Sequence, residues 1–248
     1  EDNTLCPITQ LFNRILTGKV PHANLYLTSK IIPLLKPNNS IRPIVVSDVW
    51  IRILSRIVAK SLALAAKEHL APVQLGVGVP GACEVISHAA QLYISSSVQE
   101  RCLLNVDFRN AFNSIHRSAI FEELAEAFPD LRRFFHFAYS SPSPLYLSTG
   151  EFVGECGTGV RQGDPLGPLY FSLGLQKTLR HMRSHGIETS LLAYLDDVLI
   201  MGPRTRCIQG FSMLRAKAAT IGLQVNASKS VLYSHDTTPL ILNDPPLL

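Results

Sequence analysis

Three aspartates, each next to a short apolar run, constrain this chain more than any other feature of its sequence. Asp196 and Asp197 stand between the apolar runs 190–194 and 198–201, and Asp107 follows the run 102–106. Adjacent carboxylates repel each other and lose hydration inside a fold, so a tight strand turn that carries them usually supplies a cation. Three carboxylates at neighbouring strand ends would suit Mg²⁺ or Mn²⁺, with substrate phosphates completing the shell. A pair of aspartates in a turn also occurs commonly without any metal.

The composition is that of a packed globular chain. Of the 248 residues, 46% are apolar and 17% are charged, which excludes a disordered chain and fits one large domain or two subdomains. Charged side chains interrupt the longest apolar run, so no membrane span is expected. The chain begins with Glu1 rather than Met and has no signal pattern, and we interpret it as a fragment of a longer protein.

The cysteines and the charge distribution indicate the setting and the partners. No two of the five cysteines lie within four residues of each other, so we expect reduced thiols in the nucleus or cytoplasm and no zinc site. Residues 1–95 carry a net charge of +4 and residues 96–248 a net charge of zero, which makes the N-terminal part the expected surface for a polyanion. Arg52, Arg56 and Lys60 recur at every fourth position. This basic stripe either contacts phosphates or is a solvated helix face.

The apolar patterning predicts an α+β fold. The runs 29–36 and 41–46 flank a turn-rich spacer and predict a hairpin with a basic tip. Helical spacing and end signals predict the other elements: helices at about 48–70, 82–98, 115–127, 165–184 and 205–221, strands at 102–106, 190–194 and 198–201, a hairpin over 145–153, and a short strand pair after Gly222. This order is typical of an antiparallel sheet with helices packed on one face.

A glycine-rich loop precedes the predicted helix at 165–184. Residues 159–168 read Gly-Val-Arg-Gln-Gly-Asp-Pro-Leu-Gly-Pro. Glycine lets a backbone approach a flat ligand closely, and Pro165 suits the first turn of a helix. An ordinary entry into a helix explains the glycines and prolines but not the Arg161-Gln162 pair between them.

Several of these segments, taken in chain order, resemble the motifs of reverse transcriptases, in particular those of non-LTR retrotransposons. The resemblance covers roughly residues 29–232. It rests on Asp107-Phe108-Arg109-Asn110-Ala111-Phe112, Arg161-Gln162-Gly163-Asp164-Pro165-Leu166, Tyr194-Leu195-Asp196-Asp197, and Gly222-Leu223-Gln224-Val225-Asn226 with Lys229-Ser230, and upstream on Lys36-Pro37-Asn38, Arg42-Pro43-Ile44 and Gln74-Leu75-Gly76.

The resemblance implies the fingers and palm of a right-hand polymerase that acts as an RNA-directed DNA polymerase. The fingers would occupy residues 1–98, and the palm, with its antiparallel sheet, residues 99–248. No segment reads as a helical thumb or as an endonuclease motif. Gly167 and Leu195 depart from the family pattern, which commonly has Ser at the first position and Ala or Met at the second. We expect altered efficiency or fidelity from these departures.

The resemblance also implies a role for each site residue. Asp107, Asp196 and Asp197 would hold two Mg²⁺ or Mn²⁺ ions, and Lys229 would protonate the departing pyrophosphate or be a plain surface lysine. Phe112 stands at the sugar-selecting position, where a ring collides with a 2′-hydroxyl; its alternative role is core packing. The implied dNTP contacts are Lys36, Arg42, Phe108, Phe112, Gln162 and Gly163. The implied nucleic-acid contacts are Arg52, Arg56, Lys60 and Arg161, the last of which could instead hold its loop.

The expected partners are an RNA template, a DNA primer, dNTPs, and further domains of the same polyprotein, among them a thumb and an endonuclease. Two other functions remain open. A non-catalytic, reverse-transcriptase-like scaffold could bind RNA or protein, and an RNA-dependent RNA polymerase would share the palm architecture.

Overall fold

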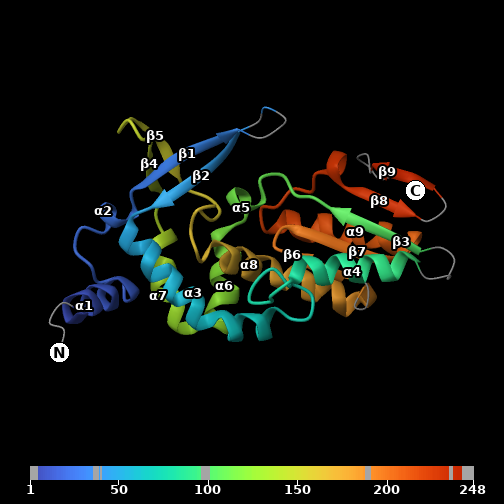
Figure 1. The fold of residues 1–248 in the computed structure, drawn as a ribbon, viewed down its shortest axis with the longest axis horizontal. Coiled ribbons are helices and arrows are strands. Elements are labelled where there is room, and N and C mark those ends of the chain that lie inside the picture. The colour runs from blue at the N-terminus through green and yellow to red at the C-terminus, as the bar shows by residue number, and fades with distance from the viewer. Residues whose placement is uncertain are drawn as a thin grey trace.

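The computed structural model describes residues 5–35, 39, 41–95, 101–187, 191–234 and 237–241. Figure 1 shows two sheets arranged along the long axis of the molecule, with most of the helices packed between and beneath them. The mixture of helices with two separate sheets confirms the predicted α+β class.

The first sheet has the strand order β2-β1-β4-β5. Strands β1 (Ser29–Leu35) and β2 (Ile41–Ser47) form the predicted antiparallel hairpin, and β4 (Ser143–Tyr146) and β5 (Phe152–Cys156) form a second one. The two hairpins join where β1 and β4 run parallel. The predicted boundary at residue 98 therefore does not separate the sheets, because β1 pairs its free edge with a strand that comes much later in the chain.

The second sheet has the strand order β6-β7-β3-β8-β9, and every pair in it is antiparallel. Its strands are β3 (Arg101–Val106), β6 (Leu191–Tyr194), β7 (Asp197–Pro203), β8 (Val231–Ser234) and β9 (Thr237–Ile241). Side chains alternate between the two faces of β3: Cys102, Leu104 and Val106 are buried, whereas Asn105 is exposed. One face of this sheet is therefore core, and the other is open.

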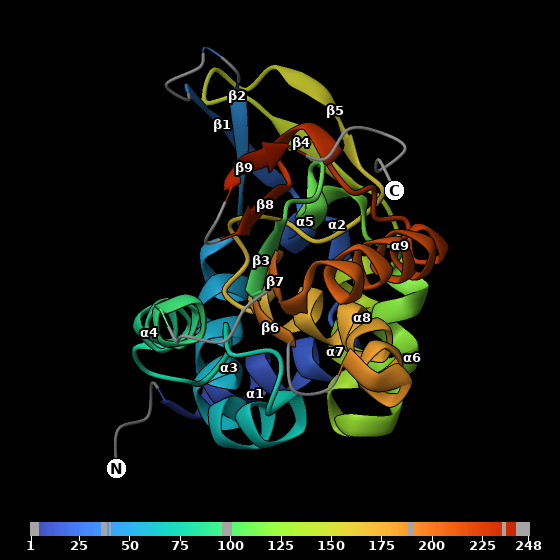
Figure 2. The ribbon, with the colours of Figure 1, turned by 90° about the vertical axis from the view of Figure 1, so that its right-hand side faces the viewer.

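The core face is covered by α8 (Gly167–Met182) and α9 (Arg204–Thr220), as Figure 2 shows. Helix α8 is buried over most of its length and also contacts α3 (Val49–Leu70) and α6 (Arg117–Ala127). Helix α4 (Ala82–Ser95) contacts β3 and β6 from the opposite side in the same view and so covers part of the open face. There the Arg101 guanidinium lies 4.7 Å from the centre of the Tyr93 ring.

All five predicted helices appear within three residues of their expected ends. The predicted helix 115–127 is α6, which begins at Arg117, and a separate short helix, α5 (Ala111–Ser114), precedes it. The chain is extended at Ile115, and the N–H of His116 donates to the carbonyl of Ile221 instead of to a helical partner. Four helices were not predicted: α5, α1 (Leu5–Leu16), α2 (Ala23–Leu27) and α7 (Arg132–Tyr139).

Two expectations from the sequence concern membrane spans and the state of the cysteines, and the described residues bear on both. No helix in these ranges is both long enough and apolar enough to cross a membrane. Cys83, Cys102, Cys156 and Cys207 form no disulfide.

Candidate active site

Strand pairing brings Asp107 and Asp197 to the same end of the second sheet. Val106 is paired with Val198 in the antiparallel β3–β7 register, so the next positions along the two strands are Asp107 and Asp197. Their buried neighbours Val106 and Val198 face the core, and side chains alternate along a strand. Both carboxylates therefore lie on the open face of the sheet.

Asp196 joins them from the turn between β6 and β7. Tyr194 is paired with Asp197, so Leu195 and Asp196 form a two-residue connection. Leu195 has a positive φ of 54°, a conformation that usually favours glycine in such a turn. The turn carries Asp196 to a partly buried position in the cleft described below.

The pKa values of Asp196 and Asp197 depend on the carboxylates that lie near them. Burial, followed by the charge of Asp107, raises the pKa of Asp196, while the Arg42 guanidinium opposes this shift. Burial likewise raises the pKa of Asp197, and the charges of Asp196 and Asp107 add to the effect. The raised pKa values indicate that nearby positive charge does not balance the negative charge of these carboxylates. A cation bound here would therefore be stabilised.

Asn226 holds Asp107 in place, although the residue pattern gave Asn226 no role of its own. Its side-chain amide donates to Oδ2 of Asp107 over 2.9 Å, and its backbone N–H donates to the Asp107 carbonyl over 2.8 Å. The hydroxyl of Ser230 accepts from the Asp107 N–H and donates to the Asn226 carbonyl. Asn226 lies between Val225, which forms an isolated bridge with Phe108, and a 3₁₀ turn, and its local sequence carries no signal for this contact.

The donor set suits a hard divalent cation only in part. Within the described ranges, no three carboxylate, imidazole or thiol side chains form a ready-made metal cage. Mg²⁺ is seldom held in a cage of protein ligands alone, because it keeps waters and takes substrate phosphates as ligands. Asp107, Asp196 and Asp197 fit this kind of open site.

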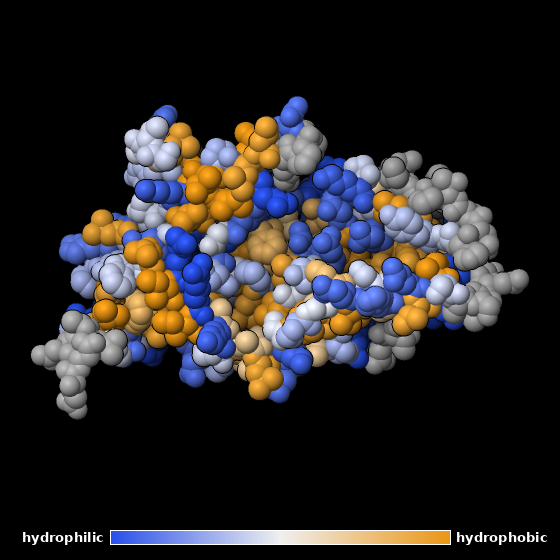
Figure 3. All heavy atoms as spheres, in the orientation of Figure 1, coloured by the Kyte–Doolittle hydropathy of each residue, from blue (hydrophilic) through white to orange (hydrophobic). Residues whose placement is uncertain are grey.

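A cleft of about 560 Å³ adjoins these carboxylates, and it collects residues from both sheets. Figure 3 shows a hollow at the centre of the molecule, between the β1–β2 hairpin and the second sheet. The volume is typical of a pocket for a small ligand. The lining includes Arg42, Ile44, Arg56, Phe112, Gln162, Gly163, Leu195 and Asp196.

Contacts with strand β2 and with Arg117 fix the glycine-rich loop in this cleft. A side chain on Gly163 would collide with the carbonyl oxygen of Val45, which would lie only 2.2 Å from its Cβ. Glycine at this position therefore allows the loop to contact strand β2 directly. On the other side, Arg117 donates to the carbonyls of Gly159, Tyr139 and Cys156, each over 2.9 Å.

The chain matches a known protein family. Residues 34–242 match the family described as "Reverse transcriptase (RNA-dependent DNA polymerase)". The chain belongs to this family.

The curated relatives of this reverse transcriptase domain include several retrotransposon proteins, which confirms the predicted non-LTR resemblance. The chain is 30% identical over 247 residues to the "Retrovirus-related Pol polyprotein from type-1 retrotransposable element R2" of Popillia japonica, covering 89% of this chain and 34% of that protein. It is 29% identical over 212 residues to the "Retrotransposable element SLACS 132 kDa protein" of Trypanosoma brucei gambiense, covering 79% of this chain and 16% of that protein. The chain thus spans about a third or less of these relatives.

Solved structures show the reverse transcriptase fold in telomerases. Telomerase from Candida albicans aligns with a TM-score of 0.63 at 13% identity, over 88% of this chain and 44% of that chain. A telomerase from Candida tropicalis, truncated from its C-terminal domain, aligns with a TM-score of 0.62 at 12% identity, over 86% and 51%. We call the first sheet, which contains the β1–β2 hairpin of the predicted fingers, the fingers sheet, and the second, antiparallel sheet the palm sheet.

Two of the predicted contact residues of this reverse transcriptase domain have buried side chains. Phe108 was expected to contact dNTP, but its side chain is 4% exposed and belongs to the hydrophobic core. Arg161 was expected to contact nucleic acid, but it is 1% exposed. Its guanidinium donates to the Ser143 hydroxyl and the Ala138 carbonyl and lies 4.4 Å from the centre of the Tyr139 ring. These contacts favour its alternative role, which is to hold the loop.

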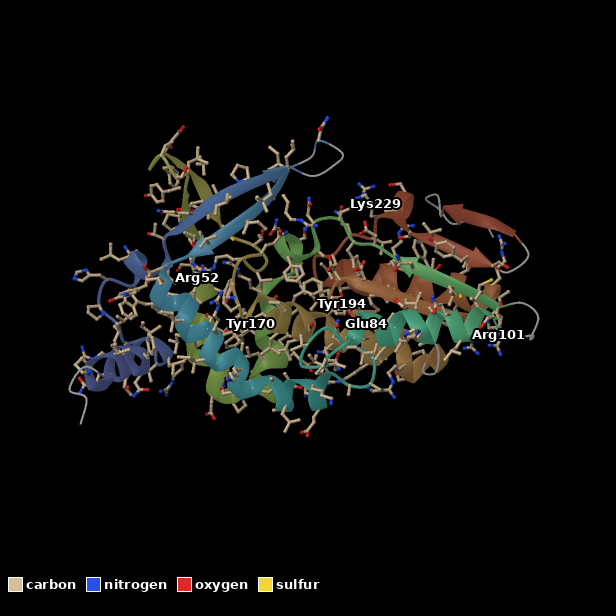
Figure 4. All side chains as sticks on the ribbon, viewed as in Figure 1. Arg52, Glu84, Arg101, Tyr170, Tyr194 and Lys229 are labelled. Carbon is tan, nitrogen blue, oxygen red and sulfur yellow. The ribbon has the colours of Figure 1, made fainter. Side chains whose placement is uncertain are left out.

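The remaining predicted residues differ in how the structure places them. Arg42, Phe112, Gln162 and Gly163 line the cleft, and so does Arg56 of the basic stripe. Lys60 is exposed and Arg52 half-buried on α3, where Figure 3 shows a hydrophilic stripe and Figure 4 labels Arg52. Lys229 is exposed in a 3₁₀ turn (Ala227–Lys229), at the rim above the palm sheet in Figure 4. Lys36 lies outside the described residues.

The loop network predicts a stability difference between two buried tyrosines. The hydroxyl of Tyr139 donates to Oδ2 of Asp164 over 2.6 Å, whereas the hydroxyl of Tyr170 has no hydrogen-bond partner among the described residues. We expect Tyr139→Phe to lower the free energy of unfolding by about 1.5–3 kcal/mol, because a buried carboxylate loses a donor. Tyr170→Phe is the matched control, with a change near zero. Urea unfolding measures both, and equal losses would contradict this account.

The raised pKa values of the aspartates predict a pH-dependent effect on stability. Both carboxyls take up protons at a higher pH in the folded chain than in the unfolded chain. Their contribution to stability is therefore greatest below about pH 4 and is lost as the pH rises through the folded-state values. We expect Asp197→Asn to raise Tm at neutral pH and to change it little in acid. A thermal melt across pH tests this; a lower Tm for the variant at neutral pH would contradict it.

Proposed function

We propose that this chain is the catalytic core of an RNA-directed DNA polymerase, which extends a primer with dNTPs on an RNA template. One observation carries the proposal. Asp107 and Asp197 stand at neighbouring strand ends of the palm sheet, and Asp196 follows from the adjoining turn, where it lines a cleft that also contains an arginine from the fingers sheet. A core that only bound RNA would have no use for three carboxylates whose burial and proximity raise the pKa of Asp196 and Asp197.

In this proposal, Asp107, Asp196 and Asp197 hold two Mg²⁺ or Mn²⁺ ions. Bound ions of this kind favour ionisation of the primer 3′-hydroxyl and neutralise charge on the leaving phosphates. Asn226 orients the Asp107 carboxylate through its amide hydrogen bond. Metal sites commonly depend on such outer hydrogen bonds.

The cleft residues would bind and orient the incoming nucleotide. Arg42 is exposed at the cleft and interacts with the charge of Asp196, and its planar guanidinium suits a triphosphate oxygen. Gln162 would pack against the new base pair, and Phe112 would lie against the sugar. Lys229 would donate a proton to the departing pyrophosphate.

Nucleic acid would approach along the basic stripe of α3. Arg56 lines the cleft, and Lys60 lies one helical turn further along the same exposed face. Exposed cations one turn apart can follow a phosphate backbone. The relatives are far longer than this chain, and we propose that a thumb and an endonuclease in the same polyprotein complete the full reaction.

Primer extension tests the proposed function. The chain is incubated with a DNA primer on an RNA template and Mg²⁺, with dNTPs in one arm and rNTPs in the other. We expect extension with dNTPs that stops when EDTA removes the divalent ions. Extension with rNTPs alone would indicate an RNA polymerase, and template binding without any extension would indicate a non-catalytic scaffold.

A further inference from the structure

Gln74 lies more than 120 residues before the aspartate turn, yet its side chain is bonded to that turn. Its amide Nε2 donates to the carbonyl of Leu195 over 2.9 Å. Its Oε1 accepts from the N–H of Leu195 over 2.8 Å and from the N–H of Gly76 over 3.0 Å. The side chain is completely buried. One amide group thus binds both backbone polar groups of the residue that precedes Asp196.

The turn needs such support because of its backbone. Leu195 holds a φ of 54° without being glycine, and a residue with a side chain adopts this region only when its surroundings compensate for the strain. The two-point hydrogen bond from Gln74 stabilises that conformation. Since Asp196 is the next residue and Asp197 the one after, the direction of both carboxylates depends on the backbone at Leu195.

Backbone hydrogen bonds hold the segment around Gln74 beside strand β6. The N–H of Leu75 donates to the carbonyl of Ala193, and the N–H of Ala193 donates to the carbonyl of Val73, each over 2.8 Å. These bonds place Gln74 beside Ala193 in a short parallel bridge at the edge of β6. The segment is thus held in register with the strand that leads into the turn.

Gly76 lies directly against Leu195 and lets the Gln74 segment approach the turn. A Cβ on Gly76 would lie 2.7 Å from the backbone nitrogen of Leu195 and 2.8 Å from its side chain. Only a residue without a side chain lets the segment approach the turn this closely. The Leu195 side chain is therefore packed against Gly76 while its backbone is bonded to Gln74.

Glutamine is the side chain that fits these partners. The site offers two N–H donors on one side and one carbonyl acceptor on the other, and a primary amide supplies both kinds of group at once. Methionine has a similar length but neither group. Glutamate can accept from both N–H groups, but when ionised it cannot donate to the Leu195 carbonyl.

We propose that Gln74 is a positioning residue for catalysis: it holds the Leu195 backbone so that Asp196 and Asp197 face the metal ions and the primer end. This role rests on the proposed polymerase function. The residue touches no substrate and acts through the turn. Its loss should therefore weaken the metal site and slow the chemical step, with little effect on the binding of primer–template or dNTP.

The test compares Gln74→Met with Gln176→Met. Gln176 is a matched control because it is also a buried glutamine, 3% exposed, and its amide donates to the carbonyls of His69 and Leu70 at the end of α3. Among the described residues, none of its hydrogen bonds reaches the turn. Both variants lose buried hydrogen bonds, so a general loss of stability should appear in both.

In primer extension, we expect Gln74→Met to lower kcat about 10- to 100-fold and to raise the Mg²⁺ concentration for half-maximal rate about 10-fold. The KM for dNTP should stay within about twofold. Gln176→Met should leave kcat and the Mg²⁺ dependence unchanged. A Gln74→Met enzyme with wild-type kcat and Mg²⁺ dependence overturns the proposal. If that variant does not fold, Gln74→Glu replaces it, and the same two quantities decide.

Hydrogen–deuterium exchange gives a readout that needs no polymerase activity. The Leu195 amide should exchange about 10-fold faster or more in Gln74→Met than in the wild type, and at the wild-type rate in Gln176→Met. If the wild-type chain does not polymerise, the proposed function fails, and the exchange measurement still decides whether Gln74 holds the turn. Unchanged exchange in Gln74→Met overturns the proposed contact.

Discussion

Asp196→Asn is expected to reduce the rate of primer extension by roughly 10³-fold or more while leaving the affinity for primer–template within about twofold. Asn has nearly the same shape as Asp but carries no charge. Asp196 lines the cleft and interacts with the charges of both Asp107 and Arg42, so its carboxylate is central to the cluster. Removing that charge weakens the attraction for divalent ions without removing the surfaces that bind nucleic acid.

Asp130→Asn is the control for this experiment. Asp130 is an exposed aspartate in the 3₁₀ turn Pro129–Leu131, and it is not among the residues that line the cleft. Single-turnover extension with saturating dNTP measures the rate, and fluorescence anisotropy of a labelled primer–template measures the affinity. Rates within tenfold of the wild type for Asp196→Asn would contradict the proposed role of the cluster.

The position of the aspartates could be predicted because strand ends are visible in the sequence. The apolar runs on both sides of Asp196-Asp197 predict a hairpin, and the apolar run before Asp107 predicts a strand that ends there. The pattern does not say which strands become neighbours. The β3–β7 pairing that brings Asp107 beside Asp197 joins residues about 90 positions apart, and such pairing is decided by packing of the whole core.

The side chains that hold the site were harder to predict than the site itself. Asn226 and Gln74 were both present in the quoted segments, but a single polar residue in a strand end or a loop has many possible roles. Their functions depend on partners more than 110 residues away, Asp107 in one case and Leu195 in the other. The burial of Arg161 was not predicted for the same reason, because exposed and buried arginines cannot be told apart by the neighbouring residues in a glycine-rich loop.

Helix boundaries show how local signals compete with tertiary contacts. The helical pattern over 115–127 appears as α6, and the bond from the His116 N–H to the Ile221 carbonyl lies just before its first residue and separates it from α5. The residues of α7 are dominated by Phe and Arg, whose helix propensity is mixed. Their helix is stabilised by burial of Phe134, Phe135 and Tyr139, which only the folded structure reveals.

Phe112→Val is expected to raise the incorporation of ribonucleotides, relative to deoxyribonucleotides, by about 10- to 100-fold. The Phe112 ring lines the cleft with Gln162 and Asp196. It also stacks on the buried ring of Phe171, with the ring centres 4.7 Å apart and the planes within 11°. The stacking fixes the ring, so it cannot swing away from an incoming sugar. Valine leaves space where the 2′-hydroxyl would otherwise collide.

Phe108→Val is the matched control for this change. Phe108 lies four residues earlier in the same segment, but it is buried in the core and absent from the cleft lining. Its loss should lower the free energy of unfolding by about 1–3 kcal/mol through the cavity that it leaves, without changing sugar selection. The ratio of kcat/KM for a dNTP to that for the matching rNTP measures the effect. If both variants keep the wild-type ratio, the core-packing role of Phe112 is sufficient and the proposed sugar gate is wrong.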